Sequence, residues 1–212
     1  KHIVTTAHYN GKIPRNPFAM YHVDPDHKER GFLTEDEIQA LSTISLDNPN
    51  FALARDLFLF GCWTGISFTD IKKLTTDNIV EMNGASWIVS KRQKTGVPFQ
   101  IKLMDIPMQI IRRYEPFRRD KRLFNIGSLD MVNKRIKAVA KKCGIEKPVS
   151  FHLSRHSFAV LALNYGMPIE SVSKILGHTN ITTTQIYAKV TNAKLENDIS
   201  AFESKISGRF VL

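Results

Sequence analysis

Residues 151–188 read FHLSRHSFAVLALNYGMPIESVSKILGHTNITTTQIYA, and this stretch is more informative about the fold than any other part of the chain. The spacing of its apolar residues and the positions of its glycine and proline residues predict three helices, over 150–165, 168–176 and 182–189. Gly166 follows the first, and glycine is common just past helix C-termini because it tolerates a positive φ. Histidine, arginine and tyrosine side chains recur along these helices, so the same stretch is also the candidate site of chemistry.

Three short motifs follow one another within this stretch. His152 and Arg155 stand three residues apart on the first helix, so their side chains share a face. The L-G-H motif at 176–178 comes next, and Tyr187 lies nine residues after its histidine. A lone H-x-x-R is a weak signal, but H-x-x-R-H, L-G-H and a tyrosine at these spacings are specific together. Over most of residues 32–190 the chain resembles the tyrosine recombinase (phage integrase) family.

Residues 79–104 have a different character and predict a three-stranded antiparallel sheet. Asn83-Gly84 is a strong hairpin signal, and residues 85–90 are rich in strand formers. Thr95-Gly96 marks a second turn, after which apolar residues recur at period two: Phe99, Ile101 and Leu103. Elsewhere the patterns indicate helices, as in the capping-box signal T-E-D-E from Thr34. The predicted fold class is therefore mainly α with a small three-stranded antiparallel β-sheet, the tyrosine recombinase catalytic fold.

The chain has 212 residues and is strongly basic, with 30 Lys+Arg, 20 Asp+Glu, a formal net charge of +10 and a pI of about 9.7. This charge favours a polyanionic partner, because Lys and Arg that neutralise phosphates release condensed counterions. A generally cationic protein is the alternative. Cys62 and Cys143 lack metal-site spacing and are expected to be buried thiols of a reducing compartment. No apolar stretch has the length of a membrane span.

The resemblance implies that Tyr187 attacks a DNA phosphate. The transition state gains charge on the non-bridging oxygens, and a guanidinium such as that of Arg155 matches this charge with two parallel hydrogen bonds. Imidazoles donate to the same oxygens or transfer a proton, a role suited to His152 and His178. Lys94 in S-K-R-Q-K-T-G matches the position of the family's general acid for the leaving 5′-oxygen. Neither a metal ion nor any other cofactor, ATP included, is expected.

Other residues have supporting or structural explanations. His156 is expected to pack against the site rather than to act directly. Asp70 resembles the acidic residue near the family's first arginine and is expected to support it. A zinc site on His152 and His156 lacks the glutamate of H-E-x-x-H and a third nearby ligand. Tyr187 alone is an ordinary half-buried tyrosine, and only the surrounding motifs favour a nucleophile.

One position departs from the family pattern. The first catalytic arginine follows a T-G-x motif, and in T-G-I-S-F-T-D-I that position is Ser67. A serine hydroxyl supplies neither a fixed positive charge nor a bidentate fork. The chain resembles in this respect the integrases of Bacteroides-type conjugative transposons, whose first arginine can be absent.

Arg92 is the residue that we expect to restore this charge. It lies two residues before Lys94, and side chains two apart on a strand share a face, so a strand that continues to Lys94 would place both on one side. The alternative for Arg92 is a contact with backbone phosphate near the turn. Arg113 and Arg118 are further basic candidates, but no local geometry ties them to the site.

The chain is expected to comprise three parts. Residues 1–31 have little periodicity and are expected to be an interdomain linker or the tail of a missing upstream core-binding domain. The catalytic domain is expected over 32–190, and a C-terminal tail helix over 191–212. The tail has one apolar face, formed by Leu195, Ile199, Phe202 and Ile206. In relatives such a tail packs on a neighbouring protomer, and here it folds either onto its own domain or onto a neighbour.

The resemblance implies an enzyme, a site-specific DNA recombinase that integrates and excises a mobile element through a 3′-phosphotyrosine intermediate. The expected partner is double-stranded DNA, including the Holliday junction, with a homo-tetramer on DNA and a monomer for the fragment alone. The expected location is the bacterial cytoplasm, and no association with a membrane is expected. Two alternatives stay open: a catalytically inactive DNA-binding relative, suggested by Ser67, and a type IB topoisomerase-like activity. The retention of Lys94, His152, Arg155, His178 and Tyr187 favours activity.

Overall fold

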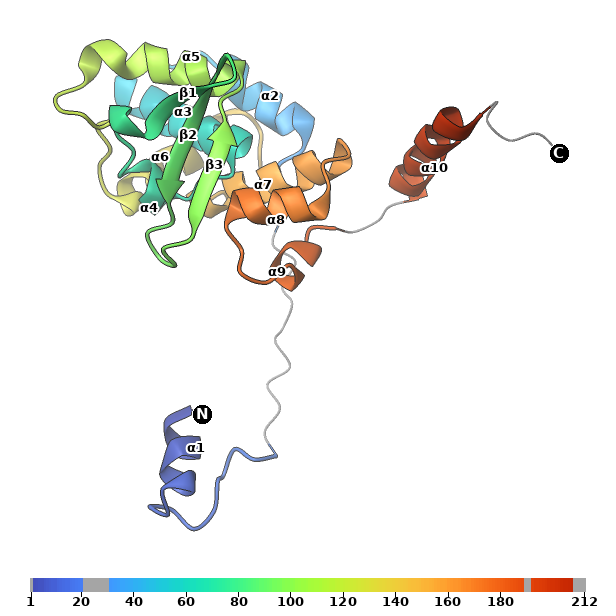
Figure 1. Cartoon of the computed structure of the whole chain (residues 1–212). Helices are drawn as coiled ribbons and strands as arrows, with labels where there is room; N and C mark the ends of the chain where they lie inside the picture. Colours follow the sequence, from blue (N-terminus) through green and yellow to red (C-terminus); the bar gives the residue numbers. More distant parts are fainter. Residues whose placement is uncertain (1, 21–30, 189–191, 208–212) are drawn as a thin grey trace.

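The computed structural model describes residues 2–20, 31–188 and 192–207, and it shows a helical body with a small sheet along one side (Figure 1). The predicted class, mainly α with a three-stranded antiparallel sheet, is confirmed. The elements in chain order are α1 (His2–Tyr9), α2 (Glu35–Thr43), α3 (Pro49–Thr64), α4 (Phe68–Ile71), the 3-10 turn η1 (Thr76–Asn78), β1 (Ile79–Met82), β2 (Ala85–Lys91), β3 (Pro98–Lys102), α5 (Asp105–Tyr114), the 3-10 turn η2 (Glu115–Phe117), α6 (Leu129–Lys142), α7 (Phe151–Asn164), α8 (Ile169–Leu176), α9 (Thr182–Gln185) and α10 (Asn192–Ile206).

Helix α3 is the centre of the core. It packs against α2, α5, α6 and α7, and a helix that is apolar on most sides is stable only in such a buried position. The ring of Phe58 on α3 contacts that of Phe151 on α7 edge to face, with centroids 6.2 Å apart. The two helices approach closely at Gly61, where a Cβ would lie 2.3 Å from Ser154 Oγ. The core thereby fixes the position of α7, which carries the H-x-x-R-H motif.

The sheet has the order β1-β2-β3, with both neighbouring pairs antiparallel. Ile88 pairs with Ile79 on one side and with Ile101 on the other, so this row of isoleucines faces the core. The predicted hairpin turn is present, with φ of 52° at Asn83 and 70° at Gly84. Strand β3 also contacts α8, which brings the β2–β3 end of the sheet beside the helix that ends in the L-G-H motif.

The N-terminal segment differs from the expectation of irregular structure over residues 1–31. Helix α1 forms there, and none of its residues is buried. Apolar residues recur at helical spacing where a helix buries one face, so a helix that buries no face shows no such pattern in the sequence. Part of the segment, 21–30, lies outside the described residues. The linker role of residues 1–31 stays a prediction.

A buried ionic cluster joins α2, α3 and α5. Asp56 is 1% exposed and accepts hydrogen bonds from Arg55, from Arg113 Nη1 at 2.9 Å and from Tyr114 Oη at 2.8 Å. Arg55 is also buried and donates to the carbonyl oxygens at the end of α2 and just after it. Burial and the Asp56 charge raise the pKa of Tyr114.

In the described part of the chain, no helix is both long enough and apolar enough to cross a bilayer.

The Asp56→Ala variant tests the importance of this cluster. We expect the free energy of unfolding to fall by roughly 3–5 kcal/mol, because the Arg55 charge stays buried without its partner. Urea denaturation measures the change. The matched control is Asp120→Ala, which removes an exposed ion pair with Arg122 and should cost less than about 1 kcal/mol. Equal, small losses in the two variants would contradict a structural role for the cluster.

Candidate active site

Arg155 links three elements of the site. From α7, its Nη1 donates to Gly65 O at 2.7 Å, just after α3, and its Nη2 donates to Leu176 O at the end of α8. Burial lowers the pKa of Arg155 to about 10, and the positive charge of Arg92 contributes to this decrease. The guanidinium therefore keeps its charge at neutral pH. The ionisable neighbours that act on Arg155 are Arg92, Tyr187 and Asp70, so three of the other predicted residues lie near this guanidinium.

Three aromatic side chains lie in a row beside Arg155. The ring centroids of His152 and His156 are 4.4 Å apart, and those of His156 and Tyr187 are 5.0 Å apart, both in edge-to-face geometry. His156 is 1% exposed, His152 is exposed and Tyr187 is half-buried. The structure therefore places His156 between an accessible imidazole and the phenol of Tyr187. The supporting role of His156 stays a prediction.

Tyr187 lies in a turn just after α9 and not inside a helix. The helix expected over 182–189 ends at Gln185, and the next residues form tighter bonds, Tyr187 N to Thr184 O and Ala188 N to Gln185 O, both 3.0 Å. The three threonines at 182–184 explain the short helix, because β-branched side chains lose rotamer freedom in a helix.

His178 is held by its backbone and by one side chain. Gly177, with φ of +64°, ends α8, and the His178 N–H donates to Ser173 O at 3.0 Å. Its Nδ1 lies 2.9 Å from the hydroxyl oxygen of Thr184. Burial, followed by the positive charges of Arg155, Arg92 and His152, lowers the pKa of His178 to about 4. This imidazole is therefore neutral at pH 7.

Arg92 and Asp70 form a buried ion pair beside Ser67. Arg92 Nη1 donates to Asp70 Oδ2 at 3.0 Å, both side chains are about 5% exposed, and Arg92 Nη2 donates to Ile175 O. The guanidinium also lies 4.0 Å from the ring centroid of Phe99. Ser67 Oγ donates to the same Asp70 oxygen at 2.7 Å. Positive charge thus stands beside the position where the family's first arginine is missing.

The inward direction of Arg92 has a different cause from the predicted one. Strand β2 ends at Lys91, so strand alternation does not place Arg92 and Lys94 on one face. Arg92 points inward because of its bonds to Asp70 and Ile175, and the absence of a Cβ at Gly177 leaves room for it: such an atom would lie 2.8 Å from Arg92 Nε.

The remaining candidates, Lys94, Arg113 and Arg118, are not among the groups whose charges act on Arg155 or His178. Lys94 is exposed in the β2–β3 turn, and within the described ranges its side chain makes no hydrogen bond or ion pair. The base of this turn is fixed, because Gln93 N donates to Asp70 Oδ1 at 2.9 Å. Arg113 pairs with Asp56 at 2.9 Å, and Arg118 with Glu115 at 3.3 Å, so neither belongs to the site.

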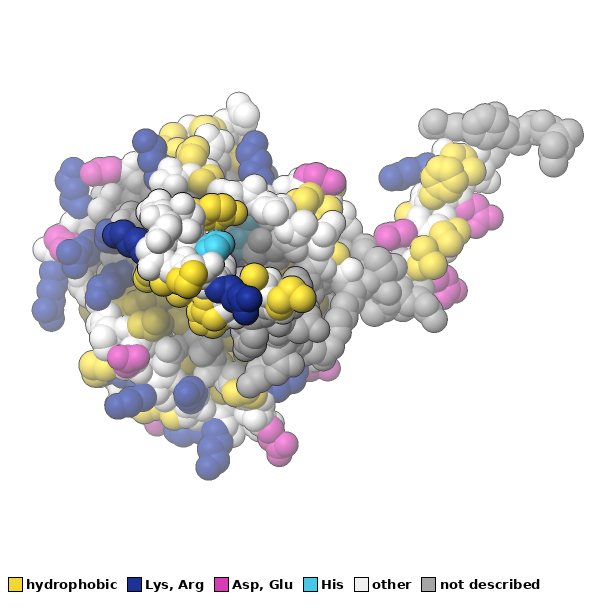
Figure 2. All heavy atoms as spheres, turned by 90° about the horizontal axis from the view of Figure 1, so that it is seen from below, with side chains coloured by type: hydrophobic (Ala, Val, Ile, Leu, Met, Phe, Trp, Pro, Cys, Tyr) yellow, Lys and Arg dark blue, Asp and Glu magenta, His cyan; other side chains and the backbone are white. Residues whose placement is uncertain are grey.

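The surface around one histidine carries hydrophobic as well as basic side chains (Figure 2). Figure 2 shows one histidine side chain in the middle of the face seen from below, with Lys and Arg side chains around it. Among the residues that the structure describes, no three side chains of His, Cys, Asp or Glu gather to form a metal site. Thr184, whose hydroxyl bonds His178, was not predicted from the sequence; its position three residues before the tyrosine, within the T-T-T run, was the available signal.

The comparisons with known proteins agree with this geometry. The sequence pattern of the Phage integrase family matches residues 31–194. The chain is a member of the phage integrase family. A curated relative of this chain, "Tyrosine recombinase XerD" from Listeria innocua serovar 6a, is 31% identical over 153 residues, which cover 67% of this chain and 52% of the relative. The chain thus spans about half of that relative's length.

Two solved integrases share the fold. The Tn1549 transposon integrase, solved in complex with circular intermediate DNA, matches with a TM-score of 0.72 and 21% identity over 92% of this chain and 74% of that one. The catalytic domain of the bacteriophage HP1 integrase matches with a TM-score of 0.59 and 22% identity over 80% of this chain and 94% of that one. These matches confirm the predicted tyrosine recombinase catalytic fold for this chain.

Proposed function

We propose that this chain is the catalytic part of a site-specific DNA recombinase. The observation that carries the proposal is the meeting of Tyr187, Arg92 and Asp70 around the Arg155 guanidinium, with His178 and His152 close to the same charges. The family and the relatives support it: one relative is named a tyrosine recombinase, and the Tn1549 integrase was solved with DNA. The basic net charge of +10 suits a DNA partner.

In the proposed reaction, Tyr187 Oη attacks the phosphorus of a DNA phosphodiester. The new O–P bond gives a 3′-phosphotyrosine, the bond to the 5′-oxygen breaks, and Lys94 protonates the leaving oxygen. Arg155 neutralises charge on the non-bridging oxygens. His152 and His178 donate to these oxygens or take the proton of the phenol, whose ordinary pKa is near 10. Attack by a 5′-hydroxyl of a partner strand reverses the steps and rejoins the DNA.

Arg92 is proposed to supply the fixed charge that Ser67 lacks. Both of its Nη atoms already donate within the protein, so it contributes charge at short range and not a free fork for the phosphate. A charge in a buried site acts strongly because little water screens it. This observation favours an active enzyme over the inactive DNA-binding relative. We propose integration and excision of a mobile element as the task of this recombinase. Strand exchange between two DNA duplexes would distinguish a recombinase from an enzyme with type IB topoisomerase-like activity.

We also propose a homo-tetramer on DNA, with α10 as the connecting element. In Figure 1 α10 stands away from the body of the protein, and Leu195, Ile199 and Phe202 are 50%, 56% and 63% exposed. This apolar face does not cover its own domain in the structure. The expected third part of the chain, 191–212, lies partly outside the described residues, which end at 207. We retain 32–190 as the proposed catalytic domain and a bacterial cytoplasmic location.

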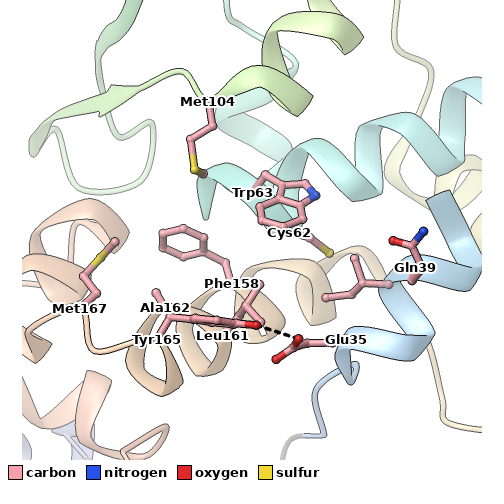
Figure 3. A pocket seen from close by; sticks show the side chains of 11 residues that line it. Glu35, Gln39, Cys62, Trp63, Met104, Phe158, Leu161, Ala162, Tyr165 and Met167 are labelled. Carbon is pink, nitrogen blue, oxygen red and sulfur yellow. Dashed lines mark hydrogen bonds between the residues drawn. The ribbon is translucent and has the colours of Figure 1, made fainter. Parts of the chain in front are cut away.

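The proposed acceptor for α10 of a second copy is a pocket of about 400 Å³ between α2, α3 and α7. Figure 3 shows its apolar lining, with Trp63 and Phe158 directed inward and Tyr165 bonded to Glu35 at the edge. Tyr165 Oη donates to Glu35 Oε2 at 2.8 Å. The apolar face of α10 of one copy would bind in the apolar pocket of another copy, because this contact removes both apolar surfaces from water.

The Tyr187→Phe variant tests the nucleophile. We expect it to form no covalent adduct with a nicked suicide DNA substrate, while its affinity for the same DNA stays nearly unchanged, because only one oxygen is lost. A denaturing gel shows the adduct, and a binding titration gives the affinity. Tyr165→Phe is the matched control, since Tyr165 is exposed at the far end of α7. An adduct formed by Tyr187→Phe would exclude the assignment.

The Arg92→Ala variant tests the replacement charge. We expect cleavage at saturating DNA to slow by roughly 100-fold or more, the range typical of a lost transition-state charge. Arg92→Lys keeps the charge and should lose less, and thermal melting of both variants checks that they fold. Ser67→Ala should cleave normally, because the hydroxyl carries no charge. Normal cleavage by Arg92→Ala would leave the missing charge unexplained and favour the inactive relative.

Truncation after Val190 tests the assembly role of the tail. We expect cooperative synapsis of two DNA sites to decrease more than cleavage of a single site, because only synapsis needs contacts between protomers. Phe202→Asp should act like the truncation, and Ser204→Asp, an exposed neighbour on α10, should not. Gel-shift and single-site cleavage assays measure the two quantities. Equal losses in both would contradict the assembly role.

A further inference from the structure

The hydroxyl of Thr184 occupies an unusual position. Its side chain is fully buried, and its Oγ1 lies 2.9 Å from His178 Nδ1. Within the described part of the chain, Nδ1 is the only hydrogen-bond partner of this hydroxyl. Thr64, also buried at a helix end, behaves differently: its Oγ1 donates to Phe60 O one turn earlier, at 2.7 Å. The Thr184 hydroxyl thus bonds the histidine, whereas the hydroxyl of a threonine in a helix ordinarily bonds a backbone carbonyl one turn earlier.

We propose that Thr184 donates this hydrogen bond and thereby fixes His178 as the tautomer with its proton on Nε2. A hydroxyl has one hydrogen, and a buried hydrogen without an acceptor costs free energy. If Nδ1–H donated to Thr184, the hydroxyl hydrogen would have no acceptor. If Thr184 donates to Nδ1, both groups are satisfied, because Nδ1 then needs no proton. The bond at one ring nitrogen decides the state of the other.

This assignment gives His178 a defined task, which rests on the proposed function. A neutral imidazole with its proton on Nε2 is a hydrogen-bond donor at that atom and cannot accept the proton of the phenol there. His178 then donates to a non-bridging phosphate oxygen and does not receive the Tyr187 proton. The lowered pKa of His178 agrees with a neutral ring, since burial and the charges of Arg155, Arg92 and His152 oppose protonation.

Thr184 also links the histidine to the nucleophile. Its carbonyl oxygen accepts the Tyr187 N–H at 3.0 Å, while its side chain bonds His178. One residue therefore positions the phenol-bearing turn and orients the imidazole ring. Thr184 touches no reacting atom in this scheme and is a positioning residue.

The tautomer of His178 can be measured directly. In the protein labelled with nitrogen-15 at histidine, the ring nitrogen shifts distinguish a proton on Nε2 from one on Nδ1, and we expect the Nε2–H form near pH 7. Thr184→Val keeps the shape and removes the hydroxyl, so it should convert His178 to a mixture of the two forms. Thr184→Ser should restore the single form. Thr183→Val, an exposed neighbour on α9, should leave the spectrum unchanged.

Cleavage of a nicked DNA substrate provides the second measurement. At saturating DNA, Thr184→Val should slow adduct formation about tenfold, the effect of one neutral hydrogen bond, and Thr184→Ser should retain most of the rate. The amide of His178→Gln donates without any tautomer, so Thr184→Val should cost little more in that background. A proton on Nδ1, or a tautomer that Thr184→Val does not change, overturns this inference. Failure of the unsubstituted protein to form an adduct overturns the proposed function and the donor role together.

Discussion

The buried ion pair between Asp70 and Arg92 is the interaction on which the site depends. It joins the short helix α4 to the turn after β2, and the second Nη of Arg92 extends the link to the end of α8. Two charges removed from water are stable only when their hydrogen bonds are satisfied, and here Asp70 also accepts from Ser67 and from the Gln93 backbone. The turn after the sheet, α4 and α8 are therefore held in one arrangement by the Asp70–Arg92 pair.

The charges around this pair are not balanced. Arg155 and Arg92 stand close enough for each to oppose the other's positive charge, while among the described residues Asp70 is the carboxylate that acts on Arg155. A surplus of positive charge in a partly buried site is unfavourable until an anion arrives. A phosphate group relieves this repulsion and accepts the hydrogen bonds that remain, so the free protein is already arranged for such a ligand. The cost of that arrangement is met by the α3-centred core, which fixes α7 independently of the site.

Local signals in the sequence were sufficient for much of this structure. Asn83-Gly84 predicted its hairpin because a turn with two positive φ values accepts few other residues, and the capping box at Thr34 is present as expected. His152 and Arg155 were placed on one face by helix geometry alone. Arg92 was found by its position near Lys94, but its inward direction depends on Asp70, 22 residues away, which no local pattern encodes. Helix α1 and the bond between Thr184 and His178 escaped prediction for related reasons: the first buries nothing, and the second forms only after folding.

The packing of Arg92 against Gly177 constrains how this site can change by mutation. Any side chain at 177 would meet the Arg92 stem, and a Cβ there is also strained by its φ of +64°. An arginine introduced in place of Ser67 would meet an Asp70 whose two oxygens still accept from Arg92 Nη1 and from the Gln93 backbone. A new arginine at position 67 beside Arg92 therefore places two guanidiniums at the Asp70 carboxylate. Loss of Arg92 without that new arginine leaves the carboxylate without a charged partner. These contacts couple positions 67, 70, 92 and 177, so the effect of a substitution at one of them depends on which residues stand at the others.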